Sequence, residues 1–473
     1  MPELTYRRRM LVLAICCMSL LIVSLDNTIL NVALPSMQRD FHASLSGLQW
    51  TIDAYLVVIA SLLLLAGSTA DRVGRKRIFQ IGLVVFTLGS ALCSLAPGLG
   101  WLIAFRMLQA VGGSMLNPVA MSIITNTFDD PKERAKAIGV WGGVVGISMA
   151  AGPIIGGALV ESVGWRSIFW INVPVGVAAL VLTARFVPDS RAPRARRIDP
   201  IGQVLVILLL GSLTYGIIEG TGAGWGSPLI VGSFVVAAAA VLALAGYERR
   251  RVDPLIDVRF FGSVPFSGAT LIAVCGFAAL GGFLFLNTLY LQNDRGLSAL
   301  DAGLYMVPMA LMCLIFAPVS GRLIGTRGAR LPLVLAGITM TASGLLFSAF
   351  HAEEHDVELF AAYVLFGIGF GLINAPITNT AVSGMPRAQA GVAAAVASTS
   401  RQVGSSLGVA VLGAALAAGL HEGAWWIIAG CGAAVLGLGF LTTGRWARGT
   451  ADRTASALMA PEAEKDKVAV STS

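Results

Sequence analysis

The sequence predicts an all-α polytopic membrane protein. Of its 473 residues, 56% are hydrophobic and only 12% are charged, whereas soluble domains average about 25% charged residues. Long apolar segments recur along the whole chain, and each has roughly the twenty residues that a helix needs to cross a hydrocarbon core of about 30 Å. The 55 glycines fit this class, because small residues let helices approach closely in lipid.

About fourteen spans are predicted, and twelve of them form an internal repeat. In order, the spans lie at about 10–33, 51–70, 78–97, 101–124, 137–160, 167–187, 200–218, 228–247, 265–290, 302–324, 331–350, 359–382, 391–418 and 424–444. The loop after span two, which begins at Gly67, has a counterpart after span ten at Gly321, and Asn27 of span one matches Asn287 of span nine. Two parallel halves around a central path are typical of secondary transporters. Spans seven and eight are therefore an insertion between two six-helix bundles.

The positions of lysine and arginine predict the orientation. With the N-terminus in the cytoplasm, 28 of the 33 basic residues fall on the inner side and three on the outer side. We expect a multi-pass protein of the inner (cytoplasmic) membrane with both termini in the cytoplasm. Its predicted parts are a cytoplasmic N-terminus (1–9), a six-helix bundle (10–187), a linker with two extra transmembrane helices (188–255), a second six-helix bundle (256–445) and a disordered cytoplasmic tail (446–473).

Span one carries a single acid, Asp26, after an uncharged run from Met10 to Leu25. An ionisable group at that depth is expensive and usually functional. Arg106 in span four lies at a similar depth and needs a partner, for which Asp26 is the first choice and Asp53 at the start of span two the second. Either a permanent salt bridge holds the bundle together, or the bridge breaks when the acid takes up a proton. We favour the second interpretation and predict proton coupling at Asp26, Arg106 and Asp53.

Two glycine-rich motifs stand at span ends. The loop after span two combines a tight turn with five charges, which anchor it on the inner side; its key residues are Gly67, Asp71, Arg72, Gly74 and Arg75. Span five carries glycines around a proline, which kinks the helix and admits a close neighbour; the residues are Gly146, Gly152, Pro153, Gly156 and Gly157. Plain close packing is the alternative explanation for the second motif.

Taken together, these motifs resemble the fourteen-span drug:proton antiporters of the major facilitator superfamily. The resemblance rests on the segments 25–35, 67–77, 152–157 and 164–176, in order and at the right span ends. It departs from the family pattern at Ser148 and Ala110, where glycine is usual. The resemblance implies that the loop at Asp71 gates the cytoplasmic side, that the span-five motif seals the outer interface of an exporter, and that transport is driven by protons.

Polar side chains inside the spans are the expected lining of the substrate cavity: Asn27, Asn31, Asn287, Asn374, Asn379, Arg401 and Gln402. Aromatic residues Phe283, Phe285, Tyr305 and Tyr363 could add an adaptable wall, and Glu219 is a minor candidate. The second half has no deep acid, and its one deep charge is Arg401. Because Asp26 and Arg106 neutralise each other, the charge count predicts a nearly neutral cavity that takes neutral, zwitterionic or monocationic compounds and rejects dications.

Other classes of function find no support in the sequence. It has no phosphate-binding loop and no metal-type spacing among its four histidines and six cysteines, so we expect no enzyme activity, cofactor, metal or nucleic-acid partner. The predicted partners are a small-molecule substrate, protons and the bilayer, and the predicted state is a monomer. The predicted function is proton-coupled efflux of small amphipathic compounds or antibiotics by alternating access. Export of an endogenous metabolite or siderophore, or a non-transporting signalling role, are the alternatives.

Overall fold

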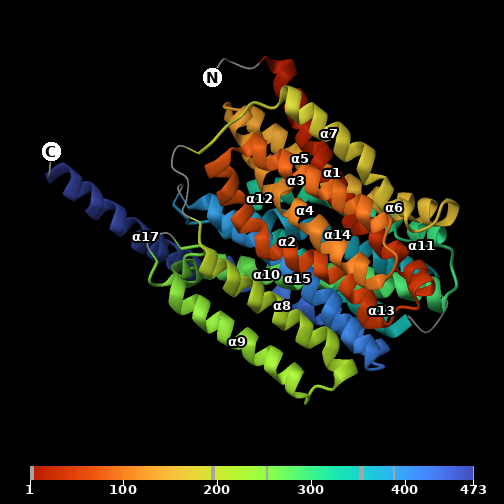
Figure 1. Ribbon diagram of the computed structural model, residues 1–473. Helices are drawn as coiled ribbons and strands as arrows, with labels where there is room; N and C mark the ends of the chain where they lie inside the picture. Colours follow the sequence, from red (N-terminus) through yellow and green to blue (C-terminus); the bar gives the residue numbers. More distant parts are fainter. Residues whose placement is uncertain (1–4, 193–197, 252–253, 351–355, 387–388, 472–473) are drawn as a thin grey trace.

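The computed structural model describes residues 5–192, 198–251, 254–350, 356–386 and 389–471, and within these ranges every regular element is a helix (Figure 1). Several helices begin where the sequence supplies a capping side chain followed by proline. Asp130, Asp199 and Ser227 each accept a hydrogen bond from the backbone of the first helical turn. A proline at the first helical position has no amide to leave unsatisfied, so this pair defines a helix start.

The first half is a bundle of six membrane-crossing units, of which the sixth is broken. The elements are α1 (Tyr6–Phe41), α2 (Leu45–Val73), α3 (Arg75–Ser94), α4 (Leu99–Thr127), α5 (Pro131–Ser162), α6 (Ser167–Trp170) and α7 (Asn172–Phe186). Helix α1 packs on α5, α7 and α4, while α3 packs on α4 and α7. This arrangement surrounds the polar residues of α1 with helices on three sides.

The second half repeats this plan. Its elements are α10 (Val264–Leu289), the π-helical turn η2 (Tyr290–Asp294), α11 (Ala299–Tyr305), α12 (Val307–Arg327), α13 (Arg330–Phe350), α14 (Asp356–Val382), α15 (Ala390–Ala417) and α16 (His421–Thr442). Helix α10 packs on α15, α14 and α16, and α2 of the first half packs on α15. The two halves therefore meet along α2 and α15 on one side.

The inserted hairpin consists of α8 (Pro200–Ala223) and α9 (Pro228–Glu248). Two side-chain hydrogen bonds join α8 to α2, one toward each end of α8: Gln203 Nε2 donates to the Ser61 carbonyl at 2.6 Å, and Trp50 Nε1 donates to Glu219 Oε1 at 2.7 Å. Helix α8 also packs on α15, whereas α9 packs mainly on α8 (Figure 1). Glu219 thus has a structural role between helices in this conformation.

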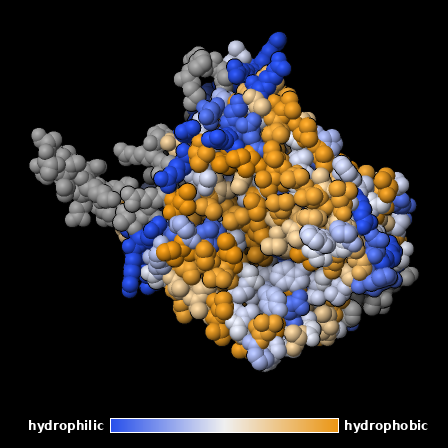
Figure 2. Space-filling model, viewed as in Figure 1, coloured by the Kyte–Doolittle hydropathy of each residue, from blue (hydrophilic) through white to orange (hydrophobic). Residues whose placement is uncertain are grey.

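Thirteen helices of the described part are long and apolar enough to cross a membrane. Helix α15 is equally long, at 28 residues, but the polar run from Ser398 to Gln402 lowers its hydropathy. Counting α15 gives the expected architecture of about fourteen spans. Figure 2 shows an apolar band across the middle of the molecule, with hydrophilic side chains toward its ends. The protein is therefore an all-α multi-pass membrane protein.

The C-terminal tail differs from the expectation of disorder. It forms helix α17 (Arg445–Ser471), which projects away from the bundles in Figure 1. Alanine, glutamate and lysine are strong helix formers and are frequent in this segment. Its first turns also pack on α10, with Ala447, Ala451 and Leu458 buried. The polar composition of the tail favoured a prediction of disorder and gave no sign of this short contact surface.

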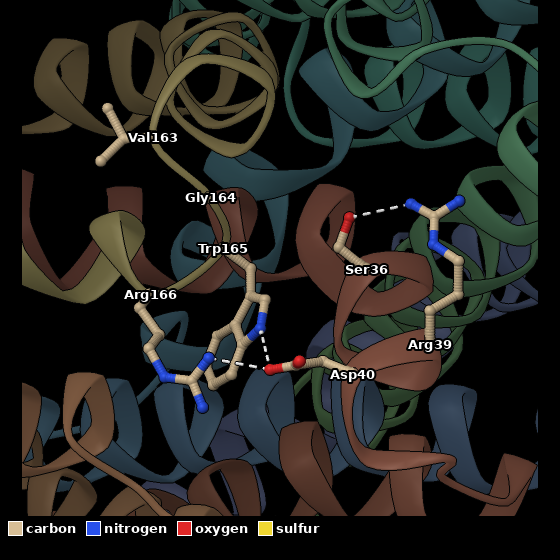
Figure 3. A pocket seen from close by; sticks show the side chains of 7 residues that line it. All are labelled: Ser36, Arg39, Asp40, Val163, Gly164, Trp165 and Arg166. Atoms are coloured by element: carbon tan, nitrogen blue, oxygen red, sulfur yellow. Dashed lines mark hydrogen bonds and ion pairs between the residues drawn. The ribbon is translucent and has the colours of Figure 1, made fainter.

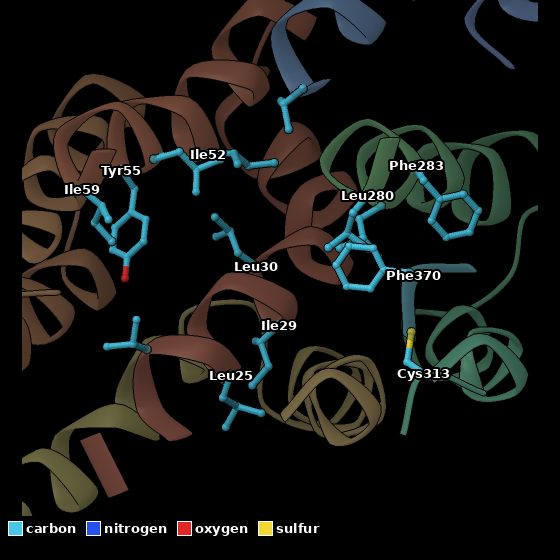
Figure 4. Packing of buried hydrophobic residues seen from close by; sticks show 14 of the residues in the cluster. Leu25, Ile29, Leu30, Ile52, Tyr55, Ile59, Leu280, Phe283, Cys313 and Phe370 are labelled. Atoms are coloured by element: carbon cyan, nitrogen blue, oxygen red, sulfur yellow. The ribbon is translucent and has the colours of Figure 1, made fainter. Parts of the chain in front are cut away.

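Buried apolar side chains of both halves form one continuous cluster (Figure 4). On the first half it includes Leu30 and Tyr55, and on the second half it includes Leu280 and Phe283. Within the second half the aromatic rings gather: Phe283 stacks on Phe366 at 4.5 Å between centroids. The aromatic residues Phe285 and Tyr363 are fully buried as well. These side chains belong to the core rather than to an open substrate wall.

Candidate functional site

Asp26 and Arg106 form a buried salt bridge between α1 and α4. Arg106 Nη1 lies 2.5 Å from Asp26 Oδ2, and the two residues are 1% and 3% exposed. Of the two acids considered as partners of Arg106, Asp26 is therefore the one that pairs with it. The guanidinium also lies 4.0 Å from the centre of the Tyr55 ring on α2, which supplies a cation–π contact in place of water.

Two amide side chains complete the Asp26 site. Gln109 Nε2 and Asn172 Nδ2 each donate to Asp26 Oδ1 at 2.9 Å, and Arg106 Nη1 also donates to Gln109 Oε1 at 2.8 Å. Asn172 Nδ2 lies 3.1 Å from Ser90 Oγ on α3 as well. One carboxylate thus joins α1 to α4 and α7. Sequence reasoning did not assign Gln109 or Asn172 to the site, although each is an uncharged polar residue inside an apolar span.

Asp53 occupies a different environment. It lies on α2, is completely buried, and neither carboxyl oxygen accepts a hydrogen bond from another described residue. Ser406 of α15 faces it from the other half. Asp53 is thus an acid at the interface of the two halves, and it lies outside the Asp26–Arg106 pair. Burying an ionised carboxylate without donors is costly, so this geometry fits the neutral acid.

Hydrogen bonds cross between the halves at the ends of the helices that face outward in the predicted orientation. One turn before Asp53, Gln49 Nε2 donates to the carbonyls of Val409 and Ala410 on α15, at 3.1 and 2.9 Å. A side chain at Gly413 would collide with Gln49, so glycine is needed at that position. On the other side, Gln292 Nε2 of η2 donates to the Val32 carbonyl of α1 at 2.9 Å. Together these contacts join the two halves at this end of the protein.

The span-five motif lies between the halves. Side chains added at Gly152 or Gly156 would press on Thr28 and Ile29 of α1. On the other face, Gly157 adjoins the backbone of Ala299 at the start of α11, and Gly303 of α11 adjoins the backbone of Pro153. Gly146 meets Leu314 of α12. The glycines therefore let α5 contact α1 on one face and the second half on the other.

The loop expected after span two is reduced to Gly74, because Gly67 to Val73 belong to α2 and Arg75 begins α3. This charged junction is bound by the linker segment. Arg75 Nη2 pairs with Asp71 Oδ1 at 2.7 Å. The Arg75 amide donates to the Ser190 carbonyl at 2.9 Å, and the Ala192 amide donates to the Asp71 carbonyl at 3.0 Å. Gly74 has φ +125° and adjoins Asp189, so a side chain there would be strained. Earlier on α2, Gly67 faces Pro118 of α4. Arg72, in the last turn of α2, is exposed.

The structure separates the predicted cavity residues into three groups. Asn27 and Asn31 lie on consecutive turns of α1, where Asn31 Nδ2 donates to the Asn27 carbonyl at 3.0 Å. Asn374, Asn379 and Arg401 lie together on α14 and α15, and the Asn374 carbonyl is 3.4 Å from Arg401 Nη2. Gln402 follows on α15 and is partly buried. By contrast, Asn287 is completely buried and accepts a hydrogen bond from Tyr363 at 2.7 Å, so it is not open to a ligand here.

A shallow pocket lies where α1 ends beside the turn between α5 and α6 (Figure 3). Asp40 accepts hydrogen bonds from Trp165 Nε1 at 3.0 Å and from Arg166 Nη1 at 2.8 Å. Arg39 points the other way, toward Ser36 at 3.2 Å. The Asp40–Arg166 pair is solvent-exposed, so it contributes little to stability. The pocket lies at a helix junction, away from the Asp26 site.

Comparison with known proteins identifies the family. Residues 16–409 match the family model described as Major Facilitator Superfamily. The chain belongs to the major facilitator superfamily. The buried ion pair, the Asp71 segment and the span-five glycines all lie in the first of its two six-span halves.

Three relatives in the major facilitator superfamily illustrate the branch. The multidrug resistance protein Stp of Mycobacterium tuberculosis is 37% identical over 88% of this chain and 77% of its own length. The tetracenomycin C resistance and export protein of Streptomyces glaucescens is 40% identical over 84% and 74%. The multidrug efflux pump LfrA of Mycolicibacterium smegmatis is 33% identical over 86% and 81%. The chain is therefore a membrane transporter similar to drug and antibiotic exporters.

Proposed function

We propose that this transporter exports small amphipathic compounds, antibiotics among them, across the cytoplasmic membrane in exchange for protons. The names of its relatives, which include multidrug and antibiotic resistance proteins, support the substrate class. The placement of 28 basic residues on one side supports cytoplasmic termini. In this proposal the protein acts as a monomer and takes its energy from the proton gradient, with no cofactor.

The observation that carries the proposal is the Asp26 site. A carboxylate bonded to Arg106, Gln109 and Asn172 holds three helices together while it is ionised. Protonation would remove its charge and weaken the bond to Arg106, because a neutral acid accepts weaker hydrogen bonds than a carboxylate. The helices would then be free to move relative to one another. Proton binding at Asp26 can thereby favour one conformation, as coupling requires.

The contacts between the halves support an assignment of conformation. The hydrogen bonds of Gln49 and Gln292 cross between the halves at their outer ends, while the Asp71 loop is bonded to the linker segment. We infer a state closed to the outside, in which Asp53 carries a proton at the interface. Loss of that proton would bury a carboxylate that has no cation beside it, and this cost would oppose closure. In this proposal Asp53 is the second proton-linked residue.

Substrate-driven proton movement in reconstituted vesicles tests this function. A panel of antibiotics is added to vesicles that contain the protein and a pH-sensitive dye, and the proposal expects proton release that Asp26→Asn abolishes. Asp40→Asn is the matched control, because Asp40 sits in an exposed pair at the end of the same helix. Undiminished proton release in Asp26→Asn, with intact insertion, would exclude Asp26 as the coupling residue.

A further inference from the structure

Arg401 is a charge inside the membrane-spanning part of the second half. It lies on α15, eleven residues after the helix begins at Ala390, a distance of about 16 Å along the axis at 1.5 Å per residue. A cation at such a depth needs compensation from a carboxylate, from several oxygen acceptors or from water. The contacts of Arg401 therefore show what its charge can be used for.

The described neighbours of Arg401 are uncharged. Nη2 lies 2.5 Å from Thr378 Oγ1 and 3.4 Å from the Asn374 carbonyl, and Nη1 lies 3.3 Å from Ser398 Oγ. Nε has no hydrogen-bond partner, and none of the ion pairs found in the described ranges involves Arg401. A cation at this depth with no counter-ion is an incomplete site, because charge-assisted bonds to a carboxylate are its strongest interactions.

The guanidinium is also accessible. Arg401 is partly exposed, and both Thr378 and Asn379 on the facing side of α14 are exposed. Below it lies an aromatic floor: Arg401 Cζ is 5.9 Å from the centre of the Phe277 ring, which in turn packs edge-on against Phe370 at 5.1 Å. A ligand can thus bring an acidic group to the guanidinium and place an apolar or aromatic body against the Phe277 ring, which is partly exposed.

We propose that Arg401 and Thr378 form a subsite for the carboxylate of an amphipathic aromatic acid. The proposal rests on the export function proposed above and adds the charge class of the substrate. The guanidinium fork matches a carboxylate in two parallel hydrogen bonds. Nη2, whose contact with Thr378 lies at the exposed side, and Nη1 are the donors that such a pair would use. The bound acid supplies the missing counter-ion.

This assignment revises the charge count made from the sequence. Arg106 is neutralised by Asp26, and Asp53 has no cation beside it, so the second half contributes one cation that no described acid balances. A cavity with this charge favours acids and zwitterions over monocations. Dications remain excluded, because a doubly charged ligand would meet a like charge without a compensating carboxylate.

A matched pair of dyes tests the subsite. Rhodamine 110 carries a free carboxylate, and rhodamine 123 is its methyl ester, so the two differ only at the group in question. Binding is measured by fluorescence anisotropy to the full chain in nanodiscs of phosphatidylcholine. The wild type is expected to bind rhodamine 110 more tightly, and Arg401→Gln to weaken that binding about tenfold, the change expected for one charge-assisted interaction, while binding of the ester changes less than twofold.

Two further variants keep the result interpretable. Arg401→Lys retains the charge without the fork, so it should bind the acid with intermediate affinity and also guards against a glutamine variant that fails to fold. Arg322→Gln removes an exposed arginine of α12 and should bind both dyes as the wild type does. Equal affinity for the two dyes, preference for the ester, no binding of either, or equal loss of both dyes in folded Arg401→Gln would each overturn the proposal.

The occupant could alternatively be a lipid phosphate, and one arm of the experiment distinguishes the two. If replacing half of the phosphatidylcholine by phosphatidylglycerol weakens rhodamine 110 binding in the wild type but not in Arg401→Gln, a lipid headgroup fills the site and the substrate assignment is wrong. Unchanged affinity supports it. Because binding is read separately from transport, selective binding without proton-driven export would refute the proposed function and leave the subsite standing.

Discussion

Each half of this transporter has one arginine within a membrane-spanning helix, and the two arginines have different surroundings. In the first half, Arg106 is enclosed by Asp26, Gln109 and the ring of Tyr55. In the second half, Arg401 meets the neutral oxygens of two hydroxyls and a backbone carbonyl, and remains partly exposed. The same charge thus serves an internal pair in one half and, in our proposal, binds an external partner in the other. Two halves with the same fold can therefore use such an arginine for different purposes.

The largest expected effect is on stability and separates the two arginines directly. Arg106→Gln leaves Asp26 buried without its cation, and breaking one side of a buried pair costs about 3–5 kcal/mol. Arg401→Gln abandons no acid and should cost about 1 kcal/mol or less, as is usual for a group with solvent access. Thermal unfolding of the purified proteins measures both changes. Equal losses would contradict the distinction, and adding Asp26→Asn to Arg106→Gln should recover much of the stability.

The next effect concerns the contact that α5 makes between the halves. Gly152→Leu would force a side chain into Thr28, and overpacking of this kind costs about 1–3 kcal/mol. We expect a protein that inserts into the membrane but loses export, measured as resistance of an efflux-deficient host. Gly142→Leu on the same helix is the control, because nothing lies within 4 Å of the added atom. Normal export by Gly152→Leu would reduce the motif to passive packing.

The smallest expected effect is on the conformational equilibrium. Gln49→Leu removes two hydrogen bonds to α15, each worth about 1 kcal/mol, and should raise the population open to the outside. Electron paramagnetic resonance distances between spin labels at Ser46 and Leu420 would report a longer separation. Gln203→Leu removes one hydrogen bond between α8 and α2 and none between the two six-helix bundles, so the label distance should not change. A shift in both variants would point to a general loss of packing.

Much of this fold was predictable because its signals are strong and local. Runs of apolar residues predict the spans, which the helices of the structure confirm. The basic residues predict an orientation, which stays a prediction. The Asp26–Arg106 pair followed from the same logic, since two opposite charges in neighbouring apolar spans leave few alternatives. The glycines around Pro153 also indicated that span five lies close to a neighbouring helix, as α5 does to α1. These predictions needed no knowledge of side-chain packing.

The uncharged residues were harder to assign. Gln109 and Asn172 bind Asp26, whereas Asn287 binds Tyr363 in the core. An amide in an apolar span is therefore compatible with a site or with a satisfied core position, and the sequence does not distinguish them. The binding of the Asp71 loop by the linker segment was equally hidden, because it uses backbone groups at Ser190 and Ala192. Contacts made by backbone groups cannot be predicted from residue type, because every residue type can make them.

The inserted hairpin has a consequence for how a hydrophobic compound reaches the protein. Helix α8 is bonded to α2 and packs on α15, so it covers the seam between the halves on that side. Among the described residues, the main contacts of the hairpin do not include α5 or α12, which form the seam on the other side. A compound dissolved in the lipid therefore meets one flank that the hairpin covers, at α2 and α15, and one flank that the hairpin leaves uncovered, at α5 and α12. Its arrival depends on partitioning and lateral diffusion within one leaflet, and we expect that route to lead past α5.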